Sequence, residues 1–151
     1  MKKHVMVRQV SGLTFAGKGD SGHWTIIDGP GEVGGNDGGP RPKEMLLLSL
    51  AGCTGSDVAS ILKKKRAPVT RLEVHVTAGM RDEHPRVFTD IHVEYVVHGK
   101  SIRANDVERA IELSETTYCA VSAMLRKSVP ITSSYRIEDP LAVRSEEEVA
   151  S

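Results

Sequence analysis

The feature that most restricts the fold is a stretch without proline that runs through residues 43–66. Pro42 suits the first turn of a helix, where a missing N–H costs nothing, and Pro68 stops the segment. Residues 45–51 are apolar on nearly all sides, the second half is amphipathic, and the basic residues 63–66 suit a helix C-terminus. The pattern predicts a long central helix whose apolar half is buried.

Short β-rich runs at residues 4–10, 13–16 and 23–28 precede this helix and predict three strands. Residues 29–42 then hold six of the 14 glycines and three of the seven prolines, which predicts a functional or partner-contacting loop. Residues 29–34 match Gly-x-Gly-x-x-Gly, but the helix cannot begin before Pro42, so a dinucleotide site is excluded. These glycines are interpreted as flexibility and left-handed turn positions.

The remaining pattern predicts a hairpin of residues 69–80 and 87–98, helices over 104–118 and 119–127, and a strand over 131–137. Asn105 or Asp106 is the predicted cap of the first of these helices, with Glu108 after it. The expected fold class is α+β, with a largely antiparallel sheet around one central helix. One domain over residues 1–151 is expected, with a frayed tail at 139–151.

Composition excludes several classes of function. The chain has 151 residues, with 20 Lys+Arg against 20 Asp+Glu, and this zero net charge argues against a nucleic-acid partner. No apolar run approaches the roughly 20 residues of a membrane span. The N-terminus lacks the apolar core of a secretory signal, so a cytoplasmic location is expected.

Cys53 and Cys119 are the candidates for chemistry. Small neighbours surround Cys53, which leaves room for a substrate, and Cys119 is expected where two helices meet, where N–H groups would lower the pKa of the thiol. The alternative, that both are small buried apolar side chains, stays open. The cysteines and the six histidines show no metal-ligand spacing, so neither a metal nor another cofactor is predicted.

Three stretches together resemble the OsmC/Ohr family, the osmotically inducible and organic hydroperoxide resistance proteins. They are Gly-Gly-Pro-Arg-Pro-Lys-Glu-Met-Leu at 38–46 running into Leu-Ala-Gly-Cys at 50–53, Pro-Arg-Val-Phe-Thr-Asp-Ile at 85–91, and Leu-Ser-Glu-Thr-Thr-Tyr-Cys-Ala-Val at 113–121. The resemblance covers roughly residues 5–138 and is greatest to a less characterised branch with Tyr-Cys-Ser/Ala-Val at the second cysteine.

The resemblance implies an OsmC-like fold, an intertwined homodimer with active sites at the subunit interface, and a role in the oxidative stress response. It also implies a thiol-dependent peroxidase in which Cys53 attacks an organic hydroperoxide and Cys119 resolves the product into a disulfide. A dithiol of the lipoyl type would reduce that disulfide. The alternative is a non-catalytic dimer of the same fold that senses redox state or binds a small ligand.

The sequence departs from the best-known members, which pair the reactive thiol with an early-strand arginine and a glutamate ten residues before the cysteine. Lys43 occupies that position here, and Glu44 is one residue nearer to Cys53. Lys43 or Arg8 could supply the positive charge, whereas Glu44 could act only if the helix bends. Asp57, one turn after Cys53, would oppose a thiolate by charge repulsion.

Overall fold

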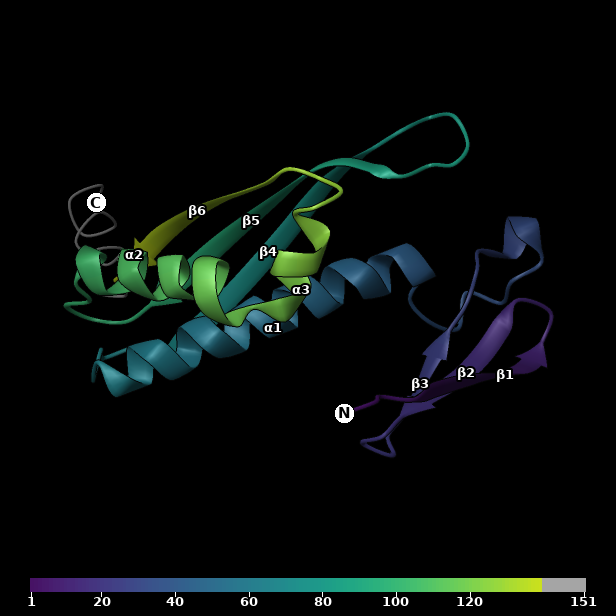
Figure 1. The fold of residues 1–151 in the computed structure, drawn as a ribbon, viewed down its shortest axis with the longest axis horizontal. Coiled ribbons are helices and arrows are strands. Elements are labelled where there is room, and N and C mark those ends of the chain that lie inside the picture. Colours follow the sequence, from purple (N-terminus) through teal and green to yellow (C-terminus); the bar gives the residue numbers. More distant parts are fainter. Residues whose placement is uncertain (140–151) are drawn as a thin grey trace, which may run out of the picture. The chain divides into compact units, whose positions relative to one another are not determined.

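The computed structural model describes residues 1–139. They form two compact units, and the boundary in the chain falls between Leu47 and Leu48. The α+β class is confirmed (Figure 1). Of the predicted tail, residues 140–151 lie outside the described part of the chain. In chain order the elements are β1 (Val5–Ser11), β2 (Thr14–Gly19), β3 (Trp24–Ile27), a 3-10 turn η1 (Gly31–Val33), α1 (Pro42–Lys64), β4 (Arg71–Met80), β5 (Phe88–His98), α2 (Ala104–Leu113), a π-helical turn η2 (Ser114–Tyr118), α3 (Ala120–Leu125) and β6 (Ile131–Glu138).

The first unit is an antiparallel sheet in the order β1-β2-β3, followed by the glycine-rich loop. Asp28 is 1% exposed and holds this loop together. Its carboxylate accepts hydrogen bonds from the hydroxyl of Thr14 and from the backbone N–H groups of Gly29, Asn36 and Gly38. The loop is therefore closed around a buried carboxylate. The sequence analysis predicted flexibility here and did not predict this ordering by Asp28.

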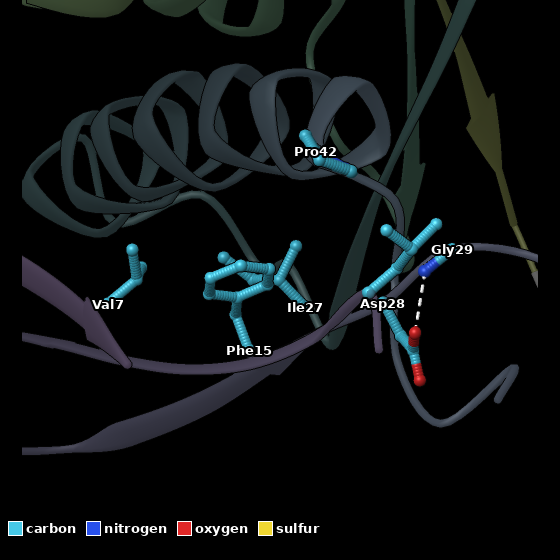
Figure 2. A pocket seen from close by; sticks show the side chains of 7 residues that line it. Val7, Phe15, Ile27, Asp28, Gly29 and Pro42 are labelled. Carbon is cyan, nitrogen blue, oxygen red and sulfur yellow. Dashed lines mark hydrogen bonds between the residues drawn. The ribbon is translucent and has the colours of Figure 1, made fainter. Parts of the chain in front are cut away.

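A pocket of about 430 Å³ lies within the first unit (Figure 2). Its lining is mainly apolar and consists of Val7, Leu13, Phe15, Ile27, Asp28, Gly29 and Pro42. The Asp28 carboxylate is bonded to the N–H of Gly29, so its charge is committed to the loop. The hollow therefore offers an apolar surface on the sheet of this unit.

The second unit contains a sheet in the order β4-β5-β6 (Figure 1). β4 and β5 form the predicted antiparallel hairpin, with Val74 opposite Tyr95. β6 pairs with β5 in parallel, so the sheet is less antiparallel than expected. The reason is the connection: α2 and α3 carry the chain back across the sheet before β6 begins, as a parallel pair requires.

α1 packs on this sheet through one stripe of buried side chains, Leu50, Thr54, Val58 and Leu62. The facing positions of β5 are equally buried and are Ile91, Val93, Tyr95 and Val97. A spacing of four residues keeps the stripe on one helix face, and alternate positions keep the strand residues on one sheet face. The stripe places the helix residues beside it, Cys53 and Asp57, at the border of the core.

The apolar first half of α1 is not buried within one chain, contrary to the sequence prediction. Leu46 is 40% and Leu48 57% exposed, because this half has more apolar surface than a single chain covers. By length and mean hydropathy, 1.6 over its best window, α1 could cross a membrane. This is weak evidence of a membrane span, since the core helix of a soluble protein meets the same criteria. In α1, Val58 and Leu62 are buried against the sheet.

The predicted cap of α2 is wrong. Arg103 occupies the N-cap position without a side-chain capping bond. Asp106 is 4% exposed and accepts hydrogen bonds from Lys65 at 3.1 Å and from Arg103 at 2.8 Å. Asp106 bonds these two cations and not the backbone N–H groups of the helix start, because hydrogen bonds between charged groups are stronger. The bond from Lys65 also connects the end of α1 to α2.

Candidate active site

The second unit brings Cys53 and Cys119 together. The two sulfur atoms and a carboxylate oxygen of Asp57 all lie within 4.8 Å of one another. Cys53 is half-buried on α1, and Asp57 follows one turn later on the same face. Cys119 is 2% exposed. A disulfide bond is about 2.05 Å long, and both cysteines are free in this structure.

The π-helical turn η2 positions Cys119. The N–H of Cys119 donates to the carbonyl of Ser114 at 2.8 Å, five residues earlier, and so closes a wider turn than an α-helix has. Cys119 is then the N-cap of α3, where its sulfur accepts the N–H of Ser122 at 3.3 Å. The sequence predicted a helix junction here, but the wide turn is a feature that it did not indicate.

A chain of buried hydroxyl groups leads from the sheet to Asp57. Tyr95 Oη lies 2.5 Å from Thr54 Oγ1, which lies 2.9 Å from Ser114 Oγ, and Ser114 donates to Asp57 Oδ2 at 3.0 Å. Each hydroxyl has one proton. Because Ser114 donates its hydroxyl proton in the hydrogen bond to the carboxylate, Thr54 must donate to Ser114, and Tyr95 must donate to Thr54. The network therefore has one direction and ends on Asp57.

The site keeps Cys119 protonated. Burial raises the pKa of the Cys119 thiol to about 11; the N–H of Ser122 opposes the rise, and Cys53 and Asp57 add to it. The N–H at the start of α3 does lower this pKa, as the sequence predicted, but the net shift is upward. One N–H group does not offset the burial of the sulfur and the negative charge facing it. Burial also raises the pKa of Tyr95 to about 12, so its phenol remains a donor.

Arg126 is hydrogen-bonded to Ser122, the residue whose N–H donates to the Cys119 sulfur. Arg126 donates to Ser122 Oγ at 3.0 Å and to the carbonyl of Ile131 at 3.1 Å, and it lies 3.5 Å from Glu115. The sequence reasoning missed Arg126, because its partners are brought together by the turn between α2 and α3. Its pairing with a carboxylate reduces the positive field that it can apply to the sulfurs.

The predicted auxiliary residues belong to the first unit. Arg8 is exposed on β1, opposite Ala16. Glu44 accepts the backbone N–H of Arg41 at 2.9 Å and so satisfies a donor at the start of α1. Lys43 is exposed on the same turn. The roles of these three side chains toward Cys53 remain predictions.

The same cluster could hold a metal ion. Within residues 1–139, the cysteine, histidine and acidic side chains form one group whose ligand atoms lie close enough to bind the same ion. Its members are Cys53, Asp57 and Cys119. A metal ion there would require both thiols to lose their protons, which the raised pKa of Cys119 opposes. The resemblance implied the pairing of the two cysteines and the spacing placed Asp57 near Cys53, but the sequence did not indicate a metal site, and its expectation of no metal stays a prediction.

The family follows from a match over most of this architecture. The model of the family described as OsmC-like protein matches residues 34–134. The chain belongs to the OsmC family, as the sequence stretches around the two cysteines predicted.

Relatives support the same assignment. Protein YhfA of Escherichia coli K12 is 43% identical over 131 residues, which is 87% of this chain and 95% of YhfA. A hypothetical protein from Aquifex aeolicus is 32% identical, with a TM-score of 0.80 over 92% of this chain and 98% of that chain. The organic hydroperoxide resistance protein OhrB of Bacillus subtilis is 18% identical, with a TM-score of 0.60 over 90% and 98%. The OsmC-like fold is confirmed.

Proposed function

We propose that the protein is a cysteine-based, thiol-dependent peroxidase that reduces organic hydroperoxides through a Cys53–Cys119 disulfide. The observation that carries the proposal is the approach of two free thiols from distant parts of the chain to within 4.8 Å. The fold shared with a hydroperoxide resistance protein supports the substrate class. An oxidative stress role follows from that chemistry.

Cys53 is the peroxidatic residue in this proposal because it is the more exposed of the two thiols. Its thiolate attacks the outer oxygen of the hydroperoxide, the O–O bond breaks, and the alcohol leaves after taking up a proton. Cys53 becomes a sulfenic acid. Cys119 then attacks the Cys53 sulfur, water leaves, and a disulfide forms. A lipoyl-type dithiol reduces this disulfide by exchange and is itself oxidised.

The proposed assembly is an intertwined homodimer. The apolar pocket of the first unit and the exposed Leu46 and Leu48 of α1 support it, because such surfaces are typical of faces that a partner covers. A cytoplasmic location is part of the proposal, since that compartment keeps thiols reduced and so returns a dithiol of this kind to its reactive form. The family match runs without a break from residue 34, near the end of the first unit, to residue 134 of the second, which supports one OsmC-like domain over residues 1–151.

Arg8, Lys43 and Glu44 are the proposed auxiliary residues. The first two carry the positive charge that a thiolate needs, and they are exposed in the first unit. In a homodimer such groups could reach the thiol of either chain. Their contribution is tested by Lys43→Met and Arg8→Met, each of which is expected to slow peroxide consumption without preventing disulfide formation.

The test is turnover of cumene hydroperoxide with dihydrolipoamide as the reductant. The native protein is expected to consume peroxide continuously, and Cys53→Ser to consume none above background. Cys119→Ser is expected to complete a single turnover and stop at the sulfenic acid. Equal rates for the native protein and Cys53→Ser would refute the peroxidase.

The charge of Asp57 favours the second candidate, a non-catalytic dimer that senses redox state or binds a small ligand. A carboxylate beside both sulfurs disfavours thiolates and helps to raise the pKa of Cys119 to about 11. Such a protein would form the disulfide slowly with any oxidant and would not turn over. Peroxide consumption that ends after one equivalent, even with reductant present, would indicate this function.

A further inference from the structure

The second step of the proposed chemistry presents a problem that the structure also resolves. Only a thiolate attacks efficiently, yet Cys119 is 2% exposed and its pKa is raised to about 11. At neutral pH nearly all of Cys119 is therefore thiol. Its proton must leave as the new S–S bond forms, so this step requires a base within reach of a buried sulfur.

Asp57 has the position for that base. Among the residues that the structure describes, it is the carboxylate grouped with both sulfurs, within 4.8 Å of each. Ser114 donates to Oδ2 at 3.0 Å, which fixes the carboxylate and leaves it further acceptor sites. Because Ser114 itself accepts from Thr54, the hydroxyl chain cannot turn away from Asp57 without losing its bonds.

Asp57 also reaches a second surface. It lines a pocket of about 250 Å³ together with Ser60, Ile61, Lys64, Leu113 and Tyr118. A proton taken from Cys119 can therefore be passed toward this pocket as well as back to the reacting atoms. The carboxylate lies beside both sulfurs and also lines a pocket that contains the polar side chains of Ser60 and Lys64, which is the placement that a proton-transfer group needs.

We propose that Asp57 is the acid–base residue of the resolving step, an inference that rests on the proposed function. The Cys119 thiol gives its proton to the Asp57 carboxylate as its sulfur attacks the Cys53 sulfenic sulfur. The S–S bond forms, the S–O bond breaks, and Asp57 delivers the proton to the departing hydroxide, which leaves as water. Asp57 returns to its carboxylate form.

The groups facing Asp57 define the pH dependence of this step. Cys53 and Cys119 lie on one side, Ser114 donates from η2, and Lys64 and Tyr118 line the pocket. Tyr95, with a pKa of about 12, stays protonated at the far end of the hydroxyl chain. With the carboxylate as base, the rate of resolution depends less steeply on pH than it does without the carboxylate. Without it, the rate follows the hydroxide concentration.

Asp57→Asn separates this role from simple charge repulsion, because the two make opposite predictions. Repulsion by Asp57 contributes to the raised pKa of Cys119, so its removal lowers that pKa and would speed resolution if Asp57 acted only as a charge. Loss of a base would instead slow resolution. The amide is close to the carboxylate in size and keeps an acceptor for Ser114.

The experiment uses 5,5′-dithiobis(2-nitrobenzoate), so it does not depend on peroxide activity. The accessible Cys53 displaces one thionitrobenzoate, and attack by Cys119 on the Cys53 mixed disulfide releases a second. This leaving group departs as an anion and needs no proton. Asp57→Asn is expected to slow the second release by at least about tenfold near pH 7 and to make it rise about tenfold per pH unit. Cys119→Ser should show the first release alone.

Asp20→Asn, a matched change at an exposed aspartate of the first unit, should leave both releases unchanged. If Asp57→Asn does not fold, as judged by circular dichroism, Asp57→Ser provides a second variant without the carboxylate. A second release that is unchanged or faster in the folded variant would overturn the proposal. A slowed second release in a protein that does not consume cumene hydroperoxide would retain Asp57 as the base of the dithiol and reject the peroxidase.

Discussion

Each unit contains an aspartate that accepts a hydrogen bond from a hydroxyl group, but the two carboxylates have different surroundings. Asp28 receives Thr14 and the N–H groups of Gly29, Asn36 and Gly38, and these hydrogen bonds outweigh the effect of burial and hold its pKa below the ordinary value. Asp57 receives Ser114 and faces two sulfur atoms. A carboxylate surrounded by donors stabilises a loop, whereas one with free acceptor sites beside thiols can act on protons.

The largest expected effect is that of Gly35→Ala, which would open the loop around Asp28. A Cβ at Gly35 would overlap the backbone of Gly29, whereas one at Gly31 would meet open space. We expect Gly35→Ala to cost about 3 kcal/mol in the free energy of unfolding and Gly31→Ala close to nothing, as measured by urea denaturation. Equal stability of the two variants would show that the loop is not closed around Asp28 as described.

Thr54→Val applies the same test to the second unit. It removes the hydroxyl that accepts from Tyr95 and donates to Ser114, leaving the buried Tyr95 phenol without that acceptor. We expect a loss of about 2 kcal/mol in urea denaturation. Thr54→Ser keeps the hydroxyl and should lose clearly less. If the two variants were equally stable, the network would not contribute to the fold.

Asp28→Asn tests the first carboxylate through pH. Since the folded pKa is lowered, the contribution of Asp28 is present above its unfolded value, near 3.8, and is lost as the pH falls through the folded pKa. The variant should melt a few degrees below the native protein at pH 7, and this gap should narrow in acid. Asp20→Asn, an exposed partner of Lys3, is the control. A gap independent of pH would contradict the assignment.

Tyr95→Phe is expected to have the smallest effect. Thr54 keeps Ser114 as a partner after the phenol is lost, so the cost should be about 1 kcal/mol or less. Tyr135→Phe removes an exposed hydroxyl that donates to Glu108 and should change the free energy of unfolding by only about a few tenths of a kcal/mol. A loss for Tyr95→Phe as large as that for Thr54→Val would mean that the phenol, and not the threonine, is the centre of the network.

Local signals in the sequence predicted the elements well. Pro42 and Pro68 bracket α1 because proline cannot continue a helix, and alternating apolar residues located the β4–β5 hairpin. The pairing of Cys53 with Cys119 was implied by resemblance to a family. It could not follow from periodicity, since 66 positions separate the cysteines in the chain.

The electrostatics of the site could not be predicted because they depend on partners remote in sequence. The local sequence around Asp106 fits a capping pattern, yet its carboxylate accepts a hydrogen bond from Lys65, 41 residues away in the chain. Ser114 orients Asp57 from a distance of 57 residues. The one usable signal was the spacing of four between Cys53 and Asp57, which correctly predicted a negative charge beside the thiol.

The wide turn of η2 makes the length of one segment critical. If one residue were deleted between Ser114 and Cys119, the same N–H would reach the same carbonyl only through an ordinary α-helical turn, which is narrower than the π-helical turn. The backbone here would shift, and with it the hydroxyl that orients Asp57 and the buried sulfur, although the composition of the protein would hardly differ. Relatives that vary in loop length elsewhere should therefore conserve the residue count here whenever they retain both thiols.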